Sequence, residues 1–313
     1  MSALVVDQAS FPGGTVADQL GLPFATVCNA LLLHSDPMAP PFFIHWQPHD
    51  TWWARIRNQI AWVGLNRLYA PILARIQDHR RRVGLPVPAR IAEIWSSRLQ
   101  ISQQPEVFEF PRRELPKHVR FVGPLRLPGG YQPVPFPWER LDGRPLIYAS
   151  LGTLQNRVAG MFRVIAEACE GLDAQLVIST GHGVAPEALG ELPGRPVVVP
   201  YAPQLDVLRR STIAVTHAGL NTVLDALATG IPMVAVPVTN EQPGIAARVA
   251  WVGAGEAIAH KNVTSQTLRS AVVRVRSNPS YRAAAMRVRD SIQAGGGAPR
   301  AAEMIEQSFG LGV

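Results

Sequence analysis

A histidine followed by two small residues and two hydrogen-bonding residues forms the centre of the densest polar pattern in this 313-residue chain. His217 follows an apolar run that ends at Thr216, and a helical pattern begins near Asn221 and Thr222. The first N–H groups of a helix have no partner within the helix, and the helix dipole favours an anion there. With an imidazole donor beside them, these groups predict a phosphate or pyrophosphate site. A helix cap with a satisfied histidine is the alternative for an isolated His-x-Gly.

A second loop with small residues follows the apolar run Leu146 to Ser150. Ser150, Gly152 and Thr153 lie where such a strand would end, and ligands of open α/β sheets bind at the carboxyl ends of strands. The loop therefore predicts further contacts with phosphate oxygens. An ordinary strand-to-helix turn is the alternative.

Apolar runs alternate with helical patterns around both loops, which predicts a doubly wound parallel sheet. The expected strands are 146–150, 175–179, 196–199, 213–216 and 233–236, with helices near 158–170 and 222–229. Closer to the amino end, residues 2–6, 15–20 and 24–27 predict a strand–helix–strand unit of another parallel sheet. A passage rich in proline and glycine divides the chain, so we expect domains at 1–122 and 138–313, a linker at 123–137, and a last helix that returns to the first domain.

A strongly basic segment lies in the first domain. Between Arg55 and Arg90 there are eight arginines and one acid, Asp78, and residues 50–83 have helical periodicity that we expect to be interrupted at Pro71. With Trp62 nearby, the segment suggests a peripheral membrane contact through Trp52, Trp53, Arg55 and Arg57. A helix pair beside a ligand cleft, with solvated arginines, is the alternative.

The composition excludes several classes of protein. With 47% hydrophobic and 17% charged residues, the chain can bury a large core. Cys28 and Cys169 are far apart and have no metal-ligand spacing, so we expect neither a disulfide nor a zinc site, and a reducing cytoplasm fits. The net charge is +7, but no nucleic-acid reading module accompanies it, so no nucleic-acid partner is expected. We expect a cytoplasmic protein, either soluble or peripheral at the inner membrane face.

The stretch from Tyr201 to Gly255 resembles the donor-binding signature of the family 1 glycosyltransferases. Tyr-Ala-Pro-Gln, Thr-His-Ala-Gly, Asn-Thr, an acid on the next helical turn, Gly-x-Pro and Glu-Gln-Pro follow one another in the family's order. Outside this signature, VVDQASFPGGTVADQLGLPF, QISQQPEVFEFPRRELP and ASLGTLQ resemble the zeaxanthin glucosyltransferase branch. The resemblance covers nearly the whole chain.

The resemblance implies an α/β fold of the GT-B type, in which two Rossmann-like domains face each other, with the amino-terminal acceptor-binding domain incomplete. It implies a nucleotide-sugar donor site in the second domain, without a metal or another cofactor. The implied donor-binding residues are Ser150, Gly152 and Thr153 on the phosphate loop, Tyr201 on the base, Gln204 beside base and ribose, His217, Gly219, Asn221 and Thr222 on the pyrophosphate, Asp225 on the ribose hydroxyls, and Glu241 and Gln242 on the sugar.

The activity implied by this resemblance is inverting transfer of a hexose, glucose from UDP-glucose, to a hydroxyl of a lipophilic acceptor such as zeaxanthin. A macrolide, flavonoid or sterol acceptor is the alternative. In this family an Asp orients a base His near the start of the first domain. Asp7 matches that Asp, whereas the chain begins after the expected place of the His.

The imidazoles nearest to Asp7 in the chain are His34, His45 and His49, for which we expect surface or packing roles. We therefore expect a chain that retains its donor site but is deficient in transfer by itself. A non-catalytic nucleotide-sugar-binding subunit that needs a partner chain is the second hypothesis.

Overall fold

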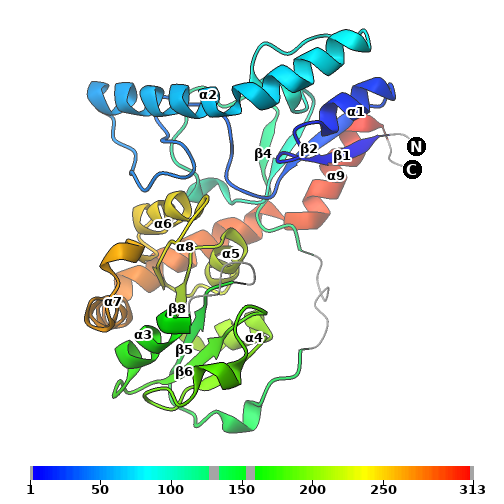
Figure 1. The fold of residues 1–313 in the computed structure, drawn as a ribbon. Coiled ribbons are helices and arrows are strands. Elements are labelled where there is room, and N and C mark those ends of the chain that lie inside the picture. The colour runs from blue at the N-terminus through cyan, green and yellow to red at the C-terminus, as the bar shows by residue number, and fades with distance from the viewer. Residues whose placement is uncertain (1–2, 127–133, 153–158, 311–313) are drawn as a thin grey trace. The chain divides into compact units, whose positions relative to one another are not determined.

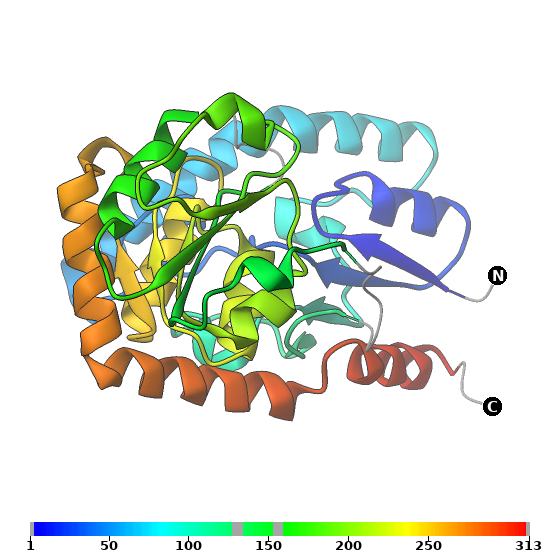
Figure 2. The same ribbon diagram turned by 90° about the horizontal axis from the view of Figure 1, so that it is seen from below.

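The computed structural model describes residues 3–126, 134–152 and 159–310. The chain forms two compact units, Met1–Pro128 with Ser291–Val313, and Gly129–Asp290. We call them unit 1 and unit 2, and the division between them falls within α8 (Pro279–Gly295). Figures 1 and 2 show the course of the chain through both units in two views.

Unit 1 is built on a parallel sheet with the strand order β1-β2-β3-β4. Its strands are β1 (Leu4–Asp7), β2 (Phe24–Cys28), β3 (Gln100–Ser102) and β4 (Val119–Phe121). Helix α1 (Gly13–Gln19) connects β1 to its parallel neighbour β2, which confirms the predicted strand–helix–strand unit. The carboxyl end of β1 therefore presents Asp7 at one edge of the sheet.

The long helix α2 (Trp52–Arg82) continues through Pro71, so the predicted interruption is wrong. Proline removes one intrahelical hydrogen bond and releases the carbonyl four residues earlier, that of Arg67. Both Pro71 and Arg67 are exposed, so solvent can satisfy that carbonyl. Buried Leu65 and Ile76 pack the helix on either side of the proline. The segment is therefore one continuous helix, and the alternative prediction of a helix pair is wrong.

Side chains from α2 bind α1 and the preceding loop, and the Arg80 guanidinium donates to the carboxylate of Asp18 on α1 over 2.7 Å. The Asn58 amide donates to the carbonyl of Pro37 over 3.0 Å, and the indole of Trp62 donates to the carbonyl of Ala39 over 2.8 Å. Within the described ranges, no helix is both long enough and apolar enough to cross a membrane.

The last helix, α9 (Gly297–Phe309), packs on the core of unit 1. Ala301 is buried with Ala25 and Ile101 of the sheet, and the N–H of Gly297 donates to the carbonyl of Val122 over 2.7 Å. The carboxyl-terminal segment thus belongs to the same compact unit as the first strands.

Unit 2 contains a parallel sheet with the order β10-β9-β8-β5-β6-β7, which confirms the predicted alternation. Its strands are β5 (Leu146–Ser150), β6 (Gln175–Ser179), β7 (Val197–Val199), β8 (Ser211–Thr216), β9 (Met233–Ala235) and β10 (Gly255–Ala257). The direction in which successive strands are added reverses between β5 and β8. Ligands of doubly wound sheets bind at such a switch point.

Helices cover both faces of this sheet. Helices α3 (Ala159–Cys169) and α7 (Ser265–Ser277) bury one face together with Ile147 and Ala149 of β5. The right-handed crossovers of a doubly wound sheet assign α4 (Gln204–Arg209), α5 (Leu220–Ala228) and α6 (Gln242–Trp251) to the opposite face. Short 3₁₀ helices span Ile91–Ile94, Glu106–Phe108, Trp138–Arg140, Pro186–Leu189 and His260–Asn262.

Candidate functional site

Two loops leave the sheet of unit 2 side by side at the switch point. Ser150 at the end of β5 and Thr216 at the end of β8 are register partners in adjacent parallel strands. The loop that begins at Gly152 and the turn at His217 therefore start from the same edge. Strand register brings together two motifs that lie far apart in the sequence.

The imidazole of His217 occupies the space between two glycines. A Cβ atom on Gly152 would lie 2.6 Å from its Cε1 atom, and a Cβ on Gly219 would collide with Nε2. Gly152 also has a φ of +80°, a backbone conformation that residues other than glycine rarely adopt. Glycine at both positions is thus a steric requirement for this placement of the ring.

Burial lowers the pKa of His217, although the nearby backbone of Ser150 opposes the shift. The Nδ1 atom is buried and has no hydrogen bond of standard geometry within the described part of the chain. The lowered pKa favours the neutral form of the ring. A neutral imidazole can still donate one N–H to a ligand oxygen.

Helix α5 begins directly after this ring, with Gly219 at its N-cap. The N–H groups of a first helical turn lack intrahelical acceptors, and the dipole makes this end attractive to anions. Asn221 is exposed at the start of the helix, whereas Thr222 is buried. The arrangement of ring, glycines and helix end suits an anionic group such as a phosphate.

Tyr201 lies half-buried after β7 and contacts His182, which is not among the residues predicted from the sequence. The ring of His182 meets the Tyr201 ring edge-to-face, with centroids 4.5 Å apart. The Tyr201 hydroxyl is buried without a partner in the described ranges. His182 follows the predicted strand 175–179 in a Thr-Gly-His turn, and that position is the signal that could have identified it.

Gln204 and Asp225 bind each other in this structure. The Gln204 amide donates to a carboxylate oxygen of Asp225 over 2.5 Å, and Asp225 is only 2% exposed. The hydroxyl of Tyr148 on β5 donates to the carbonyl oxygen of Gln204 over 3.2 Å. Tyr148 is not among the residues predicted from the sequence, although it lies two residues before Ser150 and so shares its face of the strand.

Glu241 and Gln242 begin helix α6, with Glu241 at the N-cap. The side-chain carbonyl of Gln242 accepts hydrogen bonds from the N–H groups of Val238 and Thr239, over 2.8 and 3.0 Å. Gln242 is buried and Glu241 half-buried. Gln242 therefore shapes the loop before α6 with its oxygen. Thr153, the last residue predicted on the first phosphate loop, lies outside the described residues.

Asp7, the predicted orienting acid, lies in unit 1 at the carboxyl end of β1. Its carboxylate accepts from the N–H of Ala9 over 2.7 Å and from the amide of Asn29 over 2.6 Å. His34 is buried against Trp95, with ring centroids 5.0 Å apart, whereas His45 and His49 are exposed. These placements fit the packing and surface roles expected for the three imidazoles.

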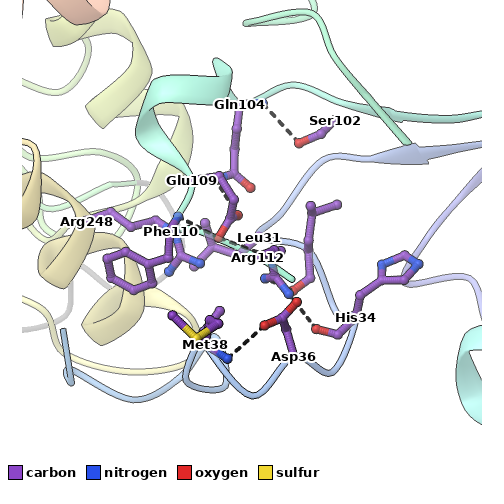
Figure 3. A network of polar contacts seen from close by, with 12 residues as sticks. Leu31, His34, Asp36, Met38, Ser102, Gln104, Glu109, Phe110, Arg112 and Arg248 are labelled. Atoms are coloured by element: carbon purple, nitrogen blue, oxygen red, sulfur yellow. Dashed lines mark hydrogen bonds and ion pairs between the residues drawn. The ribbon is translucent and has the colours of Figure 1, made fainter. Parts of the chain in front are cut away.

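The loop after β2 is fastened to the segment after β3 by a polar network (Figure 3). The Arg112 guanidinium donates to the carbonyl of His34 over 2.6 Å and pairs with Glu109. The Asp36 carboxylate accepts from the N–H groups of Arg113 and Glu114, over 2.8 and 2.9 Å.

A cavity of about 460 Å³ lies beside this loop, with apolar and hydrogen-bonding walls that include His34, Asn66, Tyr69, Leu73, Ile91 and Glu114.

Solved glycosyltransferases share this fold. The glycotransferase of kitacinnamycin superposes with a TM-score of 0.78 at 25% identity, over 98% of this chain and 76% of that chain. The calicheamicin glycosyltransferase CalG4 superposes with a TM-score of 0.75 at 23% identity, over 99% and 76%. The chain thus has the GT-B glycosyltransferase fold, which confirms the predicted fold class.

Residues 24–293 match the protein family described as "UDP-glucoronosyl and UDP-glucosyl transferase", and the chain belongs to this family. Zeaxanthin glucosyltransferase from Pseudescherichia vulneris is 34% identical over 311 residues, which cover 99% of this chain and 74% of the relative. The zeaxanthin glucosyltransferase from Pantoea ananas is 32% identical over 313 residues, covering 98% and 72%. The resemblance predicted from the motifs is confirmed.

Proposed function

We propose that this chain is an inverting glycosyltransferase that takes glucose from UDP-glucose, with the nucleotide bound by unit 2. The observation that carries the proposal is the His217 ring held between Gly152 and Gly219 at the start of α5. A neutral imidazole and a helix N-terminus there can bind the two phosphates of UDP. In this proposal Tyr201 contacts the base, and Glu241 and Gln242 contact the sugar.

During transfer, the acceptor oxygen forms a bond to the anomeric carbon while the bond from that carbon to the diphosphate breaks. We propose that His217 and the first turn of α5 stabilise the charge on the departing diphosphate, so that a metal is not needed. The proton of the acceptor hydroxyl must pass to a base, and we propose an imidazole oriented by Asp7 for this role. Because the sequence predicts no histidine of this chain there, we expect the chain by itself to bind the donor but to be deficient in transfer. A carboxylate has about four acceptor positions, and Asp7 uses two, so it can also orient an imidazole.

The proposed acceptor is a lipophilic alcohol such as zeaxanthin. The two relatives reported above are named zeaxanthin glucosyltransferases, and each matches nearly the whole of this chain. The cavity in unit 1 supports the proposal, since apolar walls with a few hydrogen-bonding groups suit a hydroxylated apolar ligand.

Calorimetric titration with UDP and UDP-glucose tests the donor site. The unmodified protein should bind both, and His217→Ala should weaken UDP binding about 10- to 100-fold through the loss of a hydrogen bond to a charged phosphate. His260→Ala, which removes an exposed imidazole from unit 2, is the matched control and should bind like the unmodified protein. Equal UDP affinity in His217→Ala and the control would refute this site. Formation of glucosylated zeaxanthin from UDP-glucose then tests the transfer step.

We also propose that α2 contacts the anionic inner face of the cytoplasmic membrane, where a lipophilic acceptor would reside. Trp52, Trp53, Ile56, Ile60 and Val63 recur at helical spacing on one exposed face, and Trp52 is 74% exposed. The central guanidinium carbon of Arg57 lies 5.3 Å from the centroid of the Trp53 ring. Basic and aromatic residues also occur together on helices that lie at membrane surfaces. Trp62, which the sequence grouped with them, is 3% exposed and is excluded from this face.

A further inference from the structure

A buried tyrosine outside the donor signature organises two of the residues within it. Tyr148 is 2% exposed, and Gln204 joins it to Asp225 through the two hydrogen bonds described above. Ile147 and Ala149 face α3 and α7, so Tyr148 points to the opposite face of the sheet. Gln204 is the first residue of α4 and Asp225 lies on α5, so three separate elements meet in this chain of bonds.

The chain of hydrogen bonds has a fixed direction. A carboxylate only accepts, so Gln204 must turn its NH₂ group toward Asp225 and its carbonyl oxygen toward Tyr148. The tyrosine must then donate its proton to that oxygen. Burial raises the pKa of Tyr148 to about 12, so the hydroxyl keeps its proton at neutral pH. The amide of Gln204 is thereby held in one of its two possible orientations.

Gln204 retains hydrogen-bonding capacity after these two bonds. An amide has two N–H donors and two acceptor positions, and each bond uses one of them. Gln204 is half-buried, whereas Asp225 is almost completely covered. A pair of neighbouring hydroxyls could therefore bind the amide with one donated and one accepted hydrogen bond. The ribose of a ribonucleotide carries such a pair, and 2′-deoxyribose does not.

We propose that Tyr148 is a positioning residue that, together with Asp225, fixes the Gln204 amide to recognise the ribose diol of the donor nucleotide. The resemblance to the family predicted a direct contact between Asp225 and the ribose hydroxyls. The bond between Gln204 and Asp225 adds a second role for this carboxylate, which is to orient the amide. The inference rests on the proposed nucleotide site in unit 2.

The test compares calorimetric affinities for UDP and 2′-deoxyuridine diphosphate. The unmodified protein should prefer UDP about tenfold, the value of one hydrogen bond. In Tyr148→Phe the carbonyl oxygen of Gln204 loses its donor while Asp225 still holds the NH₂ group, so the amide is fixed at one end only. The preference should then fall below about threefold while affinity for the deoxynucleotide stays unchanged. Gln204→Met should show the same loss, and it removes the amide without leaving a buried carbonyl unsatisfied.

The matched control is Tyr281→Phe, which removes a hydroxyl bound to Glu256 elsewhere in unit 2 and should leave the preference intact. An unchanged preference in both Tyr148→Phe and Gln204→Met would overturn the inference. Equal binding of the two nucleotides by the unmodified protein refutes only this inference. Failure of the unmodified protein to bind either nucleotide refutes the proposed function as well.

Discussion

The imidazole of His217 occupies the volume that a side chain on Gly152 would need. A Cβ atom on Gly152 would approach Cε1 of the ring to 2.6 Å, closer than non-bonded carbon atoms pack. Gly152 follows β5 and His217 follows β8, and the two strands are neighbours at the switch point of the sheet. The position of the ring in the proposed phosphate site is thus set by a residue from another loop.

Substitution of Gly152 by alanine should move the His217 ring and weaken nucleotide binding. We expect UDP affinity to fall at least about tenfold, since the ring must leave the position from which it would bind phosphate. Gly171→Ala is the control, because Gly171 has a similar φ of +68° but open space around its Cβ position. Both variants should lose about 1 kcal/mol of stability to backbone strain, measured by urea unfolding. Equal UDP affinity in the two variants would contradict the steric argument.

Protonation of His34 should destabilise the protein in acid. Burial, with smaller effects of Arg112 and His118, lowers the pKa of His34 from 6.5 to about 4. Between these values the unfolded chain binds more protons than the folded one, so the free energy of unfolding falls as the pH falls. The full contribution is present above pH 6.5, and about 3 kcal/mol of it is lost on reaching pH 4.

Urea unfolding at a series of pH values measures this effect. His34→Gln cannot titrate, so its unfolding free energy should fall less steeply between pH 6.5 and 4 than that of the unmodified protein. His45→Gln alters an exposed imidazole of the same loop and should follow the unmodified curve. Parallel curves for His34→Gln and the unmodified protein would show that His34 contributes nothing to the acid sensitivity.

The exposed face of α2 should bind anionic vesicles. We expect the protein to sediment with vesicles that contain phosphatidylglycerol and to remain in solution with pure phosphatidylcholine. Ile60→Asp should lower the partition coefficient of the protein onto these vesicles about tenfold, because it replaces an apolar side chain that is 67% exposed with a charge. Val273→Asp on α7 changes an exposed apolar residue of unit 2 and should have no effect. Absence of sedimentation with anionic vesicles would remove the proposed membrane contact.

Local sequence patterns predicted most of the elements that surround the candidate site. The apolar runs at 146–150 and 213–216 and the helical pattern near 222–229 correspond to β5, β8 and α5. These predictions succeed because strand and helix periodicities are local and need only neighbouring residues. The prediction of an interruption at Pro71 failed because packing of Leu65 and Ile76 holds the helix on both sides of the proline.

The amino-acid sequence by itself determined the alternation of strands and helices, the family, and the residue types after β5 and β8. Only the tertiary structure decided that Trp62 faces the core while Trp52 faces solvent, and that Asp225 is covered and bound to Gln204. It also brought Tyr148 into contact with Gln204. These relationships depend on strand register and on the angle at which each side chain leaves its element, and contacts between residues distant in the sequence fix both.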